Sequence, residues 1–311
     1  MEKFHLEVKK CSIGLTFIYI LSIIPMLIIS MYNYPSADDF AMGVEAYRGF
    51  RDTGNIFVAL GQGIYMAWFD YIHWMGYFTS TFFMSVPPSV FGETCYRAGV
   101  FIILGIFTFG MIYSMHALLV KALHIDKDLA NCITMILLIL TVQCMPQGLA
   151  RIEAFFWYCS AANYVLMYSQ GLIFLGLLIS AVQDEKKGKK LYDLIMATIM
   201  GFFVGGANYM TSLSVAIICV LLVFTIILNK YGKIKIWNTK DETARAMKQK
   251  WFTLLSIPAI SMLVGFICSC MAPGNNNRVG NRLQGYPANN SPAQQFGLYR
   301  LNRGGIIDSL F

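Results

Sequence analysis

Long apolar blocks separated by short polar segments dominate the chain. A helix needs about 20 predominantly apolar residues to cross the hydrocarbon core of a bilayer. Seven blocks approach or reach that length, and we expect each to be a membrane-spanning helix. They cover approximately residues 11–32, 98–120, 130–147, 162–182, 192–207, 210–229 and 251–272. The pattern predicts an all-α integral membrane protein with one membrane domain over residues 1–311.

Two of these blocks have an alternative interpretation. The first resembles a signal peptide, but it is longer than the usual apolar region of such a peptide and no small-residue cleavage site follows it. We therefore expect a retained helix. The fifth and sixth blocks are separated only by residues 205–209 and could form one helix. That helix would be longer than the hydrocarbon core is thick, and two glycines beside Asn208 favour a turn.

The segment between the first and second blocks, residues 33–97, is long and aromatic. Within it, residues 64–86 are almost apolar enough to span the bilayer. Asp70 and His73 would be costly near the bilayer centre, so we expect an interfacial helix there instead. The segment after the seventh block, residues 273–311, is rich in Gly, Asn and Pro, and we expect it on the same side as residues 33–97.

Basic residues are divided unequally between the two sides of this topology. If the N-terminus is cytoplasmic, the cytoplasmic segments are 1–10, 121–129, 183–191 and 230–250, and they contain all fifteen lysines and one arginine. The opposite side then has eight arginines and no lysine. An excess of Lys and Arg marks the cytoplasmic side of a membrane protein. We therefore predict a cytoplasmic N-terminus.

Composition narrows the class of protein further. The chain is 57% hydrophobic and 13% charged, whereas soluble domains carry about 25% charged residues. A net charge of +7 could indicate nucleic-acid binding, but the basic residues lie in short clusters between apolar blocks, so we expect no nucleic-acid partner. Most cysteines lie in or beside apolar blocks and the four histidines are scattered, so we expect no metal site.

Acidic residues, arginines and amides gather on the predicted non-cytoplasmic side. The segments on that side carry Asp38, Asp39, Arg151, Glu153, Asn163, Asn208, Tyr209, Asn275, Arg278 and Arg282. If the helices form a bundle, these side chains meet in a cleft at the membrane surface. A carboxylate is a suitable general base for a hydroxyl group, and the planar guanidinium of arginine binds phosphate. The combination indicates a phosphate-linked lipid substrate.

Simpler structural interpretations exist for several of these residues. Asp39 and the serine three residues before it match a capping box at the start of a helix. Arg151 and Glu153 could pair with each other at the surface. The Asn and Gly residues after the seventh block are typical of an exposed turn. Trp74 is more typical of a membrane-interface residue than of a substrate-stacking residue.

Three segments also resemble a known family. One helix followed by Tyr34-Pro35-Ser36-Ala37-Asp38-Asp39-Phe40 resembles the GT-C glycosyltransferases, which are multi-pass enzymes with acidic residues in the first outer loop. A stretch of Trp74, Met75 and Tyr77 around Gly76, and the run from Ala272 to Arg278, are similar to segments of a bacterial family of GT-C-like membrane proteins. Tyr77 stands where that family would have arginine.

This resemblance implies a GT-C-like fold in a bacterial plasma membrane. It also implies transfer of a sugar from a polyprenyl-phosphate donor to a cell-envelope acceptor outside the cytoplasm, without a cofactor. Asp38 or Asp39 would be the catalytic base. Arg278, with Arg282 and Arg151, would bind the donor phosphate. The residues expected to position the substrate are Glu153, Asn208, Tyr209, Trp74 and Asn275. Members of such families usually continue with further spans after the seventh, so from the resemblance we expect either a shortened chain or a minimal seven-helix version of such an enzyme.

Two functions of other classes remain open at this stage. A transporter or flippase for a lipid-linked or anionic solute would place ionisable residues near the bilayer centre and break its helices there. The break at residues 205–209 is the feature that favours it. A non-catalytic partner of a larger enzyme is the third interpretation.

Overall fold

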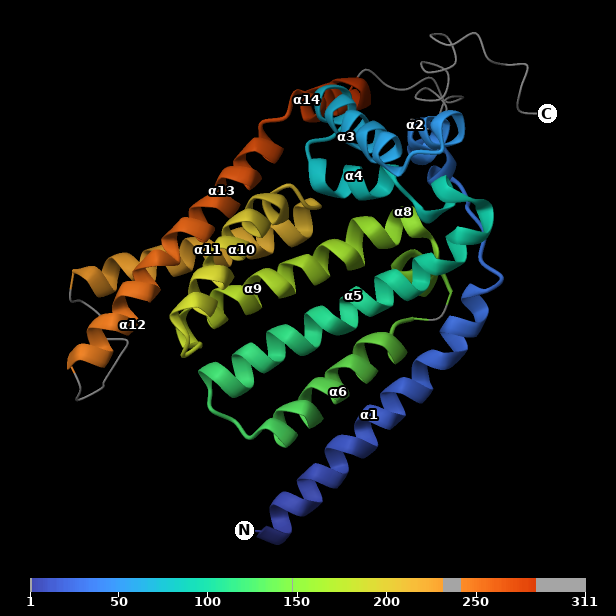
Figure 1. Ribbon diagram of the computed structural model, residues 1–311. Helices are drawn as coiled ribbons and strands as arrows, with labels where there is room; N and C mark the ends of the chain where they lie inside the picture. Colours follow the sequence, from blue (N-terminus) through green and yellow to red (C-terminus); the bar gives the residue numbers. More distant parts are fainter. Residues whose placement is uncertain (1, 147, 232–241, 284–311) are drawn as a thin grey trace, which may run out of the picture.

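The computed structural model of the chain describes residues 2–146, 148–231 and 242–283 (Figure 1). Within these residues every regular element is a helix. The prediction of an all-α protein is therefore confirmed for the described part. Most of the predicted outer C-terminal segment, residues 284–311, lies outside the described residues.

The helices follow the predicted blocks closely. In the first half of the chain they are α1 (Glu2–Ser30), α2 (Asp38–Thr53), α3 (Ile56–His73), α4 (Phe78–Ser85), the 3₁₀ turns η1 (Pro88–Phe91) and η2 (Glu93–Arg97), α5 (Ala98–Met115), the π-helical η3 (His116–Ala122) and α6 (Lys127–Gln143). In the second half they are α7 (Leu149–Arg151), the π-helical η4 (Ile152–Phe156), α8 (Tyr158–Ala161), the π-helical η5 (Ala162–Leu166), α9 (Met167–Gln183), α10 (Lys187–Gly205), α11 (Tyr209–Lys230), α12 (Glu242–Leu254), α13 (Ser256–Cys270) and α14 (Pro273–Leu283).

Five helical stretches are long and apolar enough to cross a bilayer. They are Leu6–Ser30, Glu93–Ala122, Tyr158–Gln183, Tyr209–Lys230 and Ala246–Arg278. A multi-pass membrane protein is the class that such stretches define. A helix also lies at the two remaining predicted spans, where the structure has α6 and α10. That these two helices also cross the membrane stays a prediction.

The single interfacial helix expected over residues 64–86 is wrong. The structure has two helices, α3 and α4, and the chain turns between them at residues 74–77. The turn packs so closely against α13 that only glycine fits at position 76, because a Cβ atom there would overlap the carbonyl oxygen of Ser269. The turn is thus fixed by a contact with a distant part of the chain, which hydrophobic periodicity does not report.

The expected turn after α10 is confirmed. α10 ends at Gly205, and the side chain of Asn208 caps α11 by accepting a 3.0 Å hydrogen bond from the amide of Thr211. Gly205 also lies directly against α13, since a Cβ there would come within 2.5 Å of the carbonyl oxygen of Met262. Gly201 and Gly205 form a small-xxx-small spacing, which allows two helices in a membrane to approach closely.

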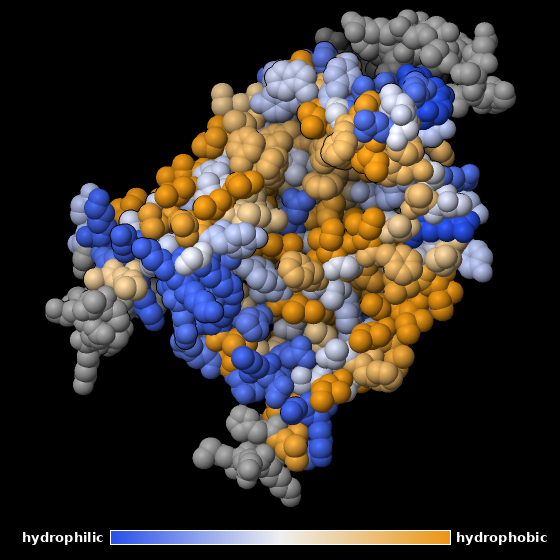
Figure 2. All heavy atoms as spheres, in the orientation of Figure 1, coloured by the Kyte–Doolittle hydropathy of each residue, from blue (hydrophilic) through white to orange (hydrophobic). Residues whose placement is uncertain are grey.

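Two groups of buried side chains hold the bundle together. One joins α1, α5, α6 and the start of the α8–α9 stretch around Phe107, Leu138 and Phe155, each of which is at most 2% exposed. The other joins α9, α10, α11 and α13 around Phe174 and Met262. Helices α2, α3, α4 and α14 lie together over one end of this bundle (Figure 1). Figure 2 shows that much of the surface between the two ends is apolar.

Candidate functional site

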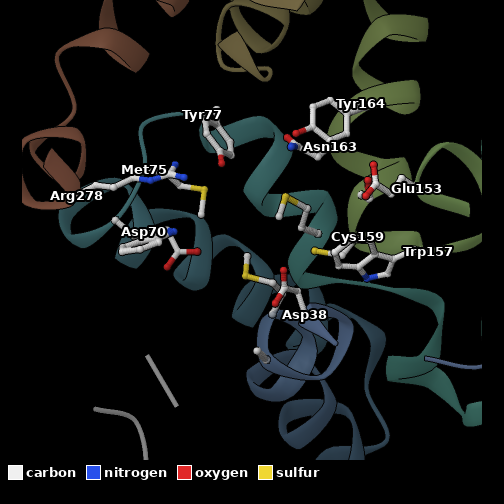
Figure 3. A pocket seen from close by; sticks show the side chains of 15 residues that line it. Asp38, Asp70, Met75, Tyr77, Glu153, Trp157, Cys159, Asn163, Tyr164 and Arg278 are labelled. Carbon is white, nitrogen blue, oxygen red and sulfur yellow. The ribbon is translucent and has the colours of Figure 1, made fainter. Parts of the chain in front are cut away.

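A cavity of about 440 Å³ lies where α2, α3, α4, η4, α8, η5 and α14 meet. Five of the residues expected in the cleft from the sequence line it: Asp38, Trp74, Glu153, Asn163 and Arg278. They come from segments far apart in the chain, and Figure 3 shows the charged side chains placed around one space. The fold thus brings carboxylates and a guanidinium group together at one end of the bundle.

Asp38 is the first residue of α2 and its side chain lines the cavity. A carboxylate in this position is favoured by the free amide groups and the positive end of the helix dipole. The side chain is only partly buried, so it is accessible to a ligand in the cavity.

Asp39 points away from the cavity into the protein and is 2% exposed. Its Oδ2 accepts hydrogen bonds from the Tyr96 hydroxyl at 2.5 Å and from the amide of Ser36 at 3.0 Å. Its Oδ1 accepts a 2.8 Å hydrogen bond from the amide of Cys159. Burial raises the pKa of Asp39, and the three donors oppose that rise. One half of the expected capping box is present, the bond from the amide of Ser36 to Asp39, and Asp39 also ties α2 to η2 and α8.

Arg278 lies beside two aromatic rings in the cavity wall. Its guanidinium carbon is 5.2 Å from the centre of the Trp74 ring, a distance suited to a cation–π contact. Burial raises the pKa of Tyr77, and the charge and hydrogen bonding of Arg278 oppose that rise. The guanidinium thus contacts the ring of Trp74 and the hydroxyl of Tyr77, and it is directed toward the cavity (Figure 3). It is therefore placed to bind an anion.

The α3–α4 turn, which contains Trp74, is joined to α14, which contains Arg278, by hydrogen bonds and close packing. The amide of Gly76 donates a 3.0 Å hydrogen bond to Oδ1 of Asn275, and the Tyr209 hydroxyl donates to the same oxygen at 2.6 Å. Gly274 packs so closely that a Cβ would lie 2.6 Å from the backbone nitrogen of Trp74. Asn275 and Tyr209 thus act behind the cavity wall, where they hold α14 against the α3–α4 turn.

Other expected site residues have structural roles outside the cavity. Arg151 donates a 3.0 Å hydrogen bond to the carbonyl oxygen of Gln143, and it also faces the carbonyls of Val142 and Met145. It therefore caps the end of α6 and does not reach the cavity, contrary to its expected role in phosphate binding. Its expected alternative partner, Glu153, points to the cavity. Asn208 caps α11, and its amide nitrogen donates to the carbonyl oxygen of Asn163.

Arg282 falls within α14, but its side chain lies outside the described residues.

Sequence reasoning missed several residues of the cavity wall. Asp70 is fully buried and lines the cavity, although in the sequence it served only to argue against a membrane span. Trp157 also lines it, beside Asn163, which the sequence had placed on this side. Within the described part of the chain, neither the indole nitrogen of Trp157 nor Oδ1 of Asn163 makes a hydrogen bond. Buried polar atoms normally have a hydrogen-bond partner, and a ligand bound in the cavity would supply one.

The cavity combines acid–base groups with an anion-binding group. Asp38, Asp70 and Glu153 supply carboxylates, and Arg278 supplies the positive charge. No cluster of three or more side chains of metal-binding type occurs among the described residues. The chemistry that the described side chains offer is acceptance of a proton next to a bound anionic group.

A second cavity, of about 870 Å³ and almost entirely apolar, lies on the other side of α3. Its wall includes Ala67, Trp68 and Tyr71 of α3, Phe78 and Phe82 of α4, and Met196, Ile199, Phe202 and Phe203 of α10. Residues of α3 and α4 line both cavities, so the polar and the apolar space share two helices in their walls.

Comparison of the chain with protein-family models, with curated proteins and with solved structures finds no match.

Proposed function

We propose that the chain is a membrane glycosyltransferase that moves a sugar from a polyprenyl-phosphate donor to a hydroxyl group of a cell-envelope acceptor. The observation that carries this proposal is the placement of Asp38 and Arg278 on the walls of one cavity. A general base and a phosphate-binding group at one site are the two functions that such a transfer requires.

In the proposed reaction the acceptor oxygen attacks the anomeric carbon of the sugar. The bond between this carbon and the phosphate oxygen breaks, and polyprenyl phosphate leaves with the bonding electrons. Asp38 accepts the proton of the acceptor hydroxyl. Arg278 binds the phosphate and stabilises the charge that develops on it, as preorganised donors do in other transfer reactions. We assign the base to Asp38 and not to Asp39, because Asp39 is buried and its carboxylate accepts three hydrogen bonds from the protein.

The apolar cavity behind α3 supports a lipid-linked donor. Aromatic and aliphatic side chains form its wall, and it is larger than the polar cavity. A donor whose phosphate lies at Arg278 could place its hydrocarbon chain along this wall, because α3 and α4 contribute to both spaces.

The proposed location is a bacterial plasma membrane, with the cavity on the non-cytoplasmic side. The long stretch Tyr158–Gln183 supports this polarity. Asn163, near its start, lines the cavity of Asp38, whereas Lys186 and Lys189 follow its end. Lysines and the proposed site thus lie at opposite ends of one helix, as the excess of lysine on the cytoplasmic side requires.

The test is transfer by the purified full chain in lipid nanodiscs, assayed against a panel of polyprenyl-phosphate sugars. Asp38→Asn removes the base, and we expect kcat to fall by a factor on the order of 10² to 10⁴. Asp52→Asn, near the other end of α2, is the matched control, because Asp52 is exposed and pairs only with Arg51 in the described structure. It should transfer sugar like the unaltered chain.

A second variant separates phosphate binding from proton transfer. Arg278→Lys keeps the charge but loses the planar fork and its stacking on Trp74. We expect kcat/KM for the donor to fall by about 30-fold, corresponding to about 2 kcal/mol. Full transfer activity in Asp38→Asn contradicts the proposed base. Movement of intact donor across the bilayer without transfer would instead identify a flippase.

A further inference from the structure

A lysine-rich cavity of about 730 Å³ lies at the other end of the bundle from Asp38. Its polar wall consists of Lys121, His124, Gln183, Asp184, Glu185, Lys186, Lys189, Lys190 and Lys248. Figure 2 shows the polar side chains gathered where α9 ends and α10 begins. The proposed transfer reaction uses none of these residues.

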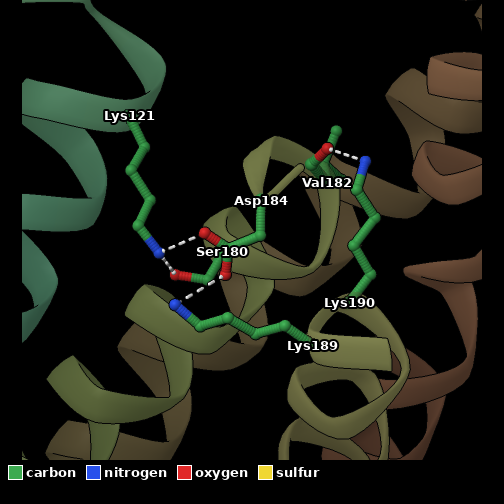
Figure 4. Close-up of polar contacts among 6 residues, drawn as sticks. All are labelled: Lys121, Ser180, Val182, Asp184, Lys189 and Lys190. Atoms are coloured by element: carbon green, nitrogen blue, oxygen red, sulfur yellow. Dashed lines mark hydrogen bonds and ion pairs between the residues drawn. The ribbon is translucent and has the colours of Figure 1, made fainter. Parts of the chain in front are cut away.

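Asp184 organises one side of this cavity. Its Oδ1 lies 2.8 Å from Nζ of Lys121, and its Oδ2 lies 3.3 Å from Nζ of Lys189 (Figure 4). Lys121 also donates a 2.9 Å hydrogen bond to the hydroxyl of Ser180. Burial favours a higher pKa for Asp184, but the hydrogen bonds and charges of its partners outweigh it and lower the pKa. Two lysines from different helices are thereby fixed around one carboxylate.

Lys190 is built into the opposite wall. Its side chain is buried, and its Nζ donates a 2.8 Å hydrogen bond to the carbonyl oxygen of Val182 (Figure 4). The same nitrogen lies 5.6 Å from the centre of the Trp251 ring. Burial lowers the pKa of Lys190. A lysine held in this way is part of a formed site and not a loose surface side chain.

Positive charge exceeds negative charge in this cavity. Five lysines and two carboxylates line it, which leaves a surplus of three positive charges. Counting the adjoining Asp193, which shares a hydrogen bond with Asp184, leaves two. A concave site of one sign focuses the field and attracts ions of the other sign. The ligand that fits is an anion.

The position of the cavity indicates the source of that anion. It lies at the boundary between the polar helix ends and the apolar surface of the bundle. Exposed apolar side chains lie close in sequence to its lysines: Leu123 follows Lys121 by two residues, Leu191 follows Lys190 directly, and Ile195 is about one helical turn further along α10. Basic pockets between membrane helices at this depth bind the head groups of anionic lipids. A soluble anion would need no such apolar border.

We propose that this cavity binds the phosphate-bearing head group of an anionic phospholipid, taken from the leaflet opposite to the Asp38 cavity. Lys186, just before α10, and Lys248 of α12 face the head group, while the acyl chains lie along Leu191 and Ile195. The site is independent of the sugar-transfer proposal.

The experiment measures lipid binding to the purified full chain in detergent by native mass spectrometry. Phosphatidylglycerol is the probe, phosphatidylcholine the zwitterionic comparison, and inorganic phosphate the soluble competitor. The double variant K186Q/K248Q removes two charges from the cavity. We expect it to bind phosphatidylglycerol about 30-fold more weakly, since each lysine near an anionic lipid contributes a factor of about five.

The matched control is K9Q/K10Q, which removes two exposed lysines of α1 that do not line the cavity. It should bind phosphatidylglycerol like the unaltered chain, and melting temperatures measured without lipid should confirm that both double variants fold. An equal loss of binding in the control would overturn the proposal, because net charge alone would then explain it. Equal binding of phosphatidylcholine, or displacement of phosphatidylglycerol by inorganic phosphate alone, would overturn it as well.

Discussion

The hydroxyl of Tyr96 donates a 2.5 Å hydrogen bond to Oδ2 of Asp39, and the same hydroxyl accepts a 3.0 Å hydrogen bond from the amide of Tyr158. A buried chain of hydrogen bonds therefore connects α2, η2 and α8. Because α2 also carries Asp38, this connection sets where Asp38 stands in the cavity. The two neighbouring aspartates thus have separate roles: Asp39 fixes α2 against η2 and α8, and Asp38 lines the cavity.

Asp39→Asn should destabilise the folded chain. Oδ2 of Asp39 accepts from Tyr96 and Ser36, and Oδ1 accepts from Cys159. Whichever way the asparagine amide is turned, its NH₂ group faces at least one of these donors. A buried donor without an acceptor costs about 1–3 kcal/mol. We expect the free energy of unfolding to fall by about 2–3 kcal/mol, measured by thermal or denaturant unfolding in detergent.

Asp38→Asn is the matched comparison for stability, since it makes the same chemical change one residue away. Its side chain lines the cavity and makes none of these buried hydrogen bonds. Its melting temperature should stay close to that of the unaltered chain. A loss of stability in Asp38→Asn equal to that in Asp39→Asn would contradict the division of tasks.

The interlocked turn at Gly76 gives a second prediction. A Cβ at Gly76 would overlap the carbonyl oxygen of Ser269 and come within 2.9 Å of the Asn275 amide nitrogen. Gly76→Ala should therefore push α14 away from the α3–α4 turn. Overpacking costs about 1–3 kcal/mol, and more where backbone has to move. We expect a lower melting temperature and weaker donor binding, because Trp74 and Arg278 would separate.

Gly61→Ala is a control for this variant on the neighbouring helix α3. A Cβ at Gly61 would meet no atom within 4 Å. Alanine also favours the helix over glycine by up to about 1 kcal/mol. The variant should be as stable as the unaltered chain or slightly more so. Unchanged stability in Gly76→Ala would show that α14 does not depend on this contact.

The distribution of charge along the sequence predicted that many polar residues lie at one end of the bundle. Asp38, Glu153 and Arg278 do line one cavity at that end, whereas the membrane surface that each helix end faces stays a prediction from the distribution of lysine. Depth alone does not specify which way a side chain points. Successive residues of a helix point about 100° apart. Asp38 and Asp39 therefore face different surroundings although they are adjacent.

The residues that sequence reasoning misplaced depend on contacts between distant segments. Arg151 faces the carbonyls at the end of α6, and this partner becomes visible only when the chain turn after α6 is known. Asp70 looked like an obstacle to membrane insertion, yet it points into the bundle and lines the cavity. Asn275 looked like a turn residue, and its contact with Gly76 bridges α14 and the α3–α4 turn.

The Asp184 ion pairs give a prediction about pH. Its partners lower the pKa of Asp184 below the ordinary value of 3.8. The charged form is thus favoured by folding, so the stabilisation is present above pH 3.8 and is lost as the pH falls through the lowered pKa. Asp184→Asn should lower the free energy of unfolding at pH 7 by about 2 kcal/mol. Melting temperatures in detergent from pH 7 downward should show this difference shrinking at acid pH.

Glu7→Gln is the control for the pH experiment. Glu7 pairs with Lys10 on the surface of α1, and both side chains are more than half exposed. An ion pair of this kind contributes little to stability, so the variant should follow the unaltered chain at every pH. A difference between Asp184→Asn and the unaltered chain that stays constant down to the most acid pH would contradict the prediction. It would show that Asp184 stabilises the fold through packing or neutral hydrogen bonds and not through its charge. The net charge of the lysine-rich cavity would then have to be calculated without the ion pairs of Asp184.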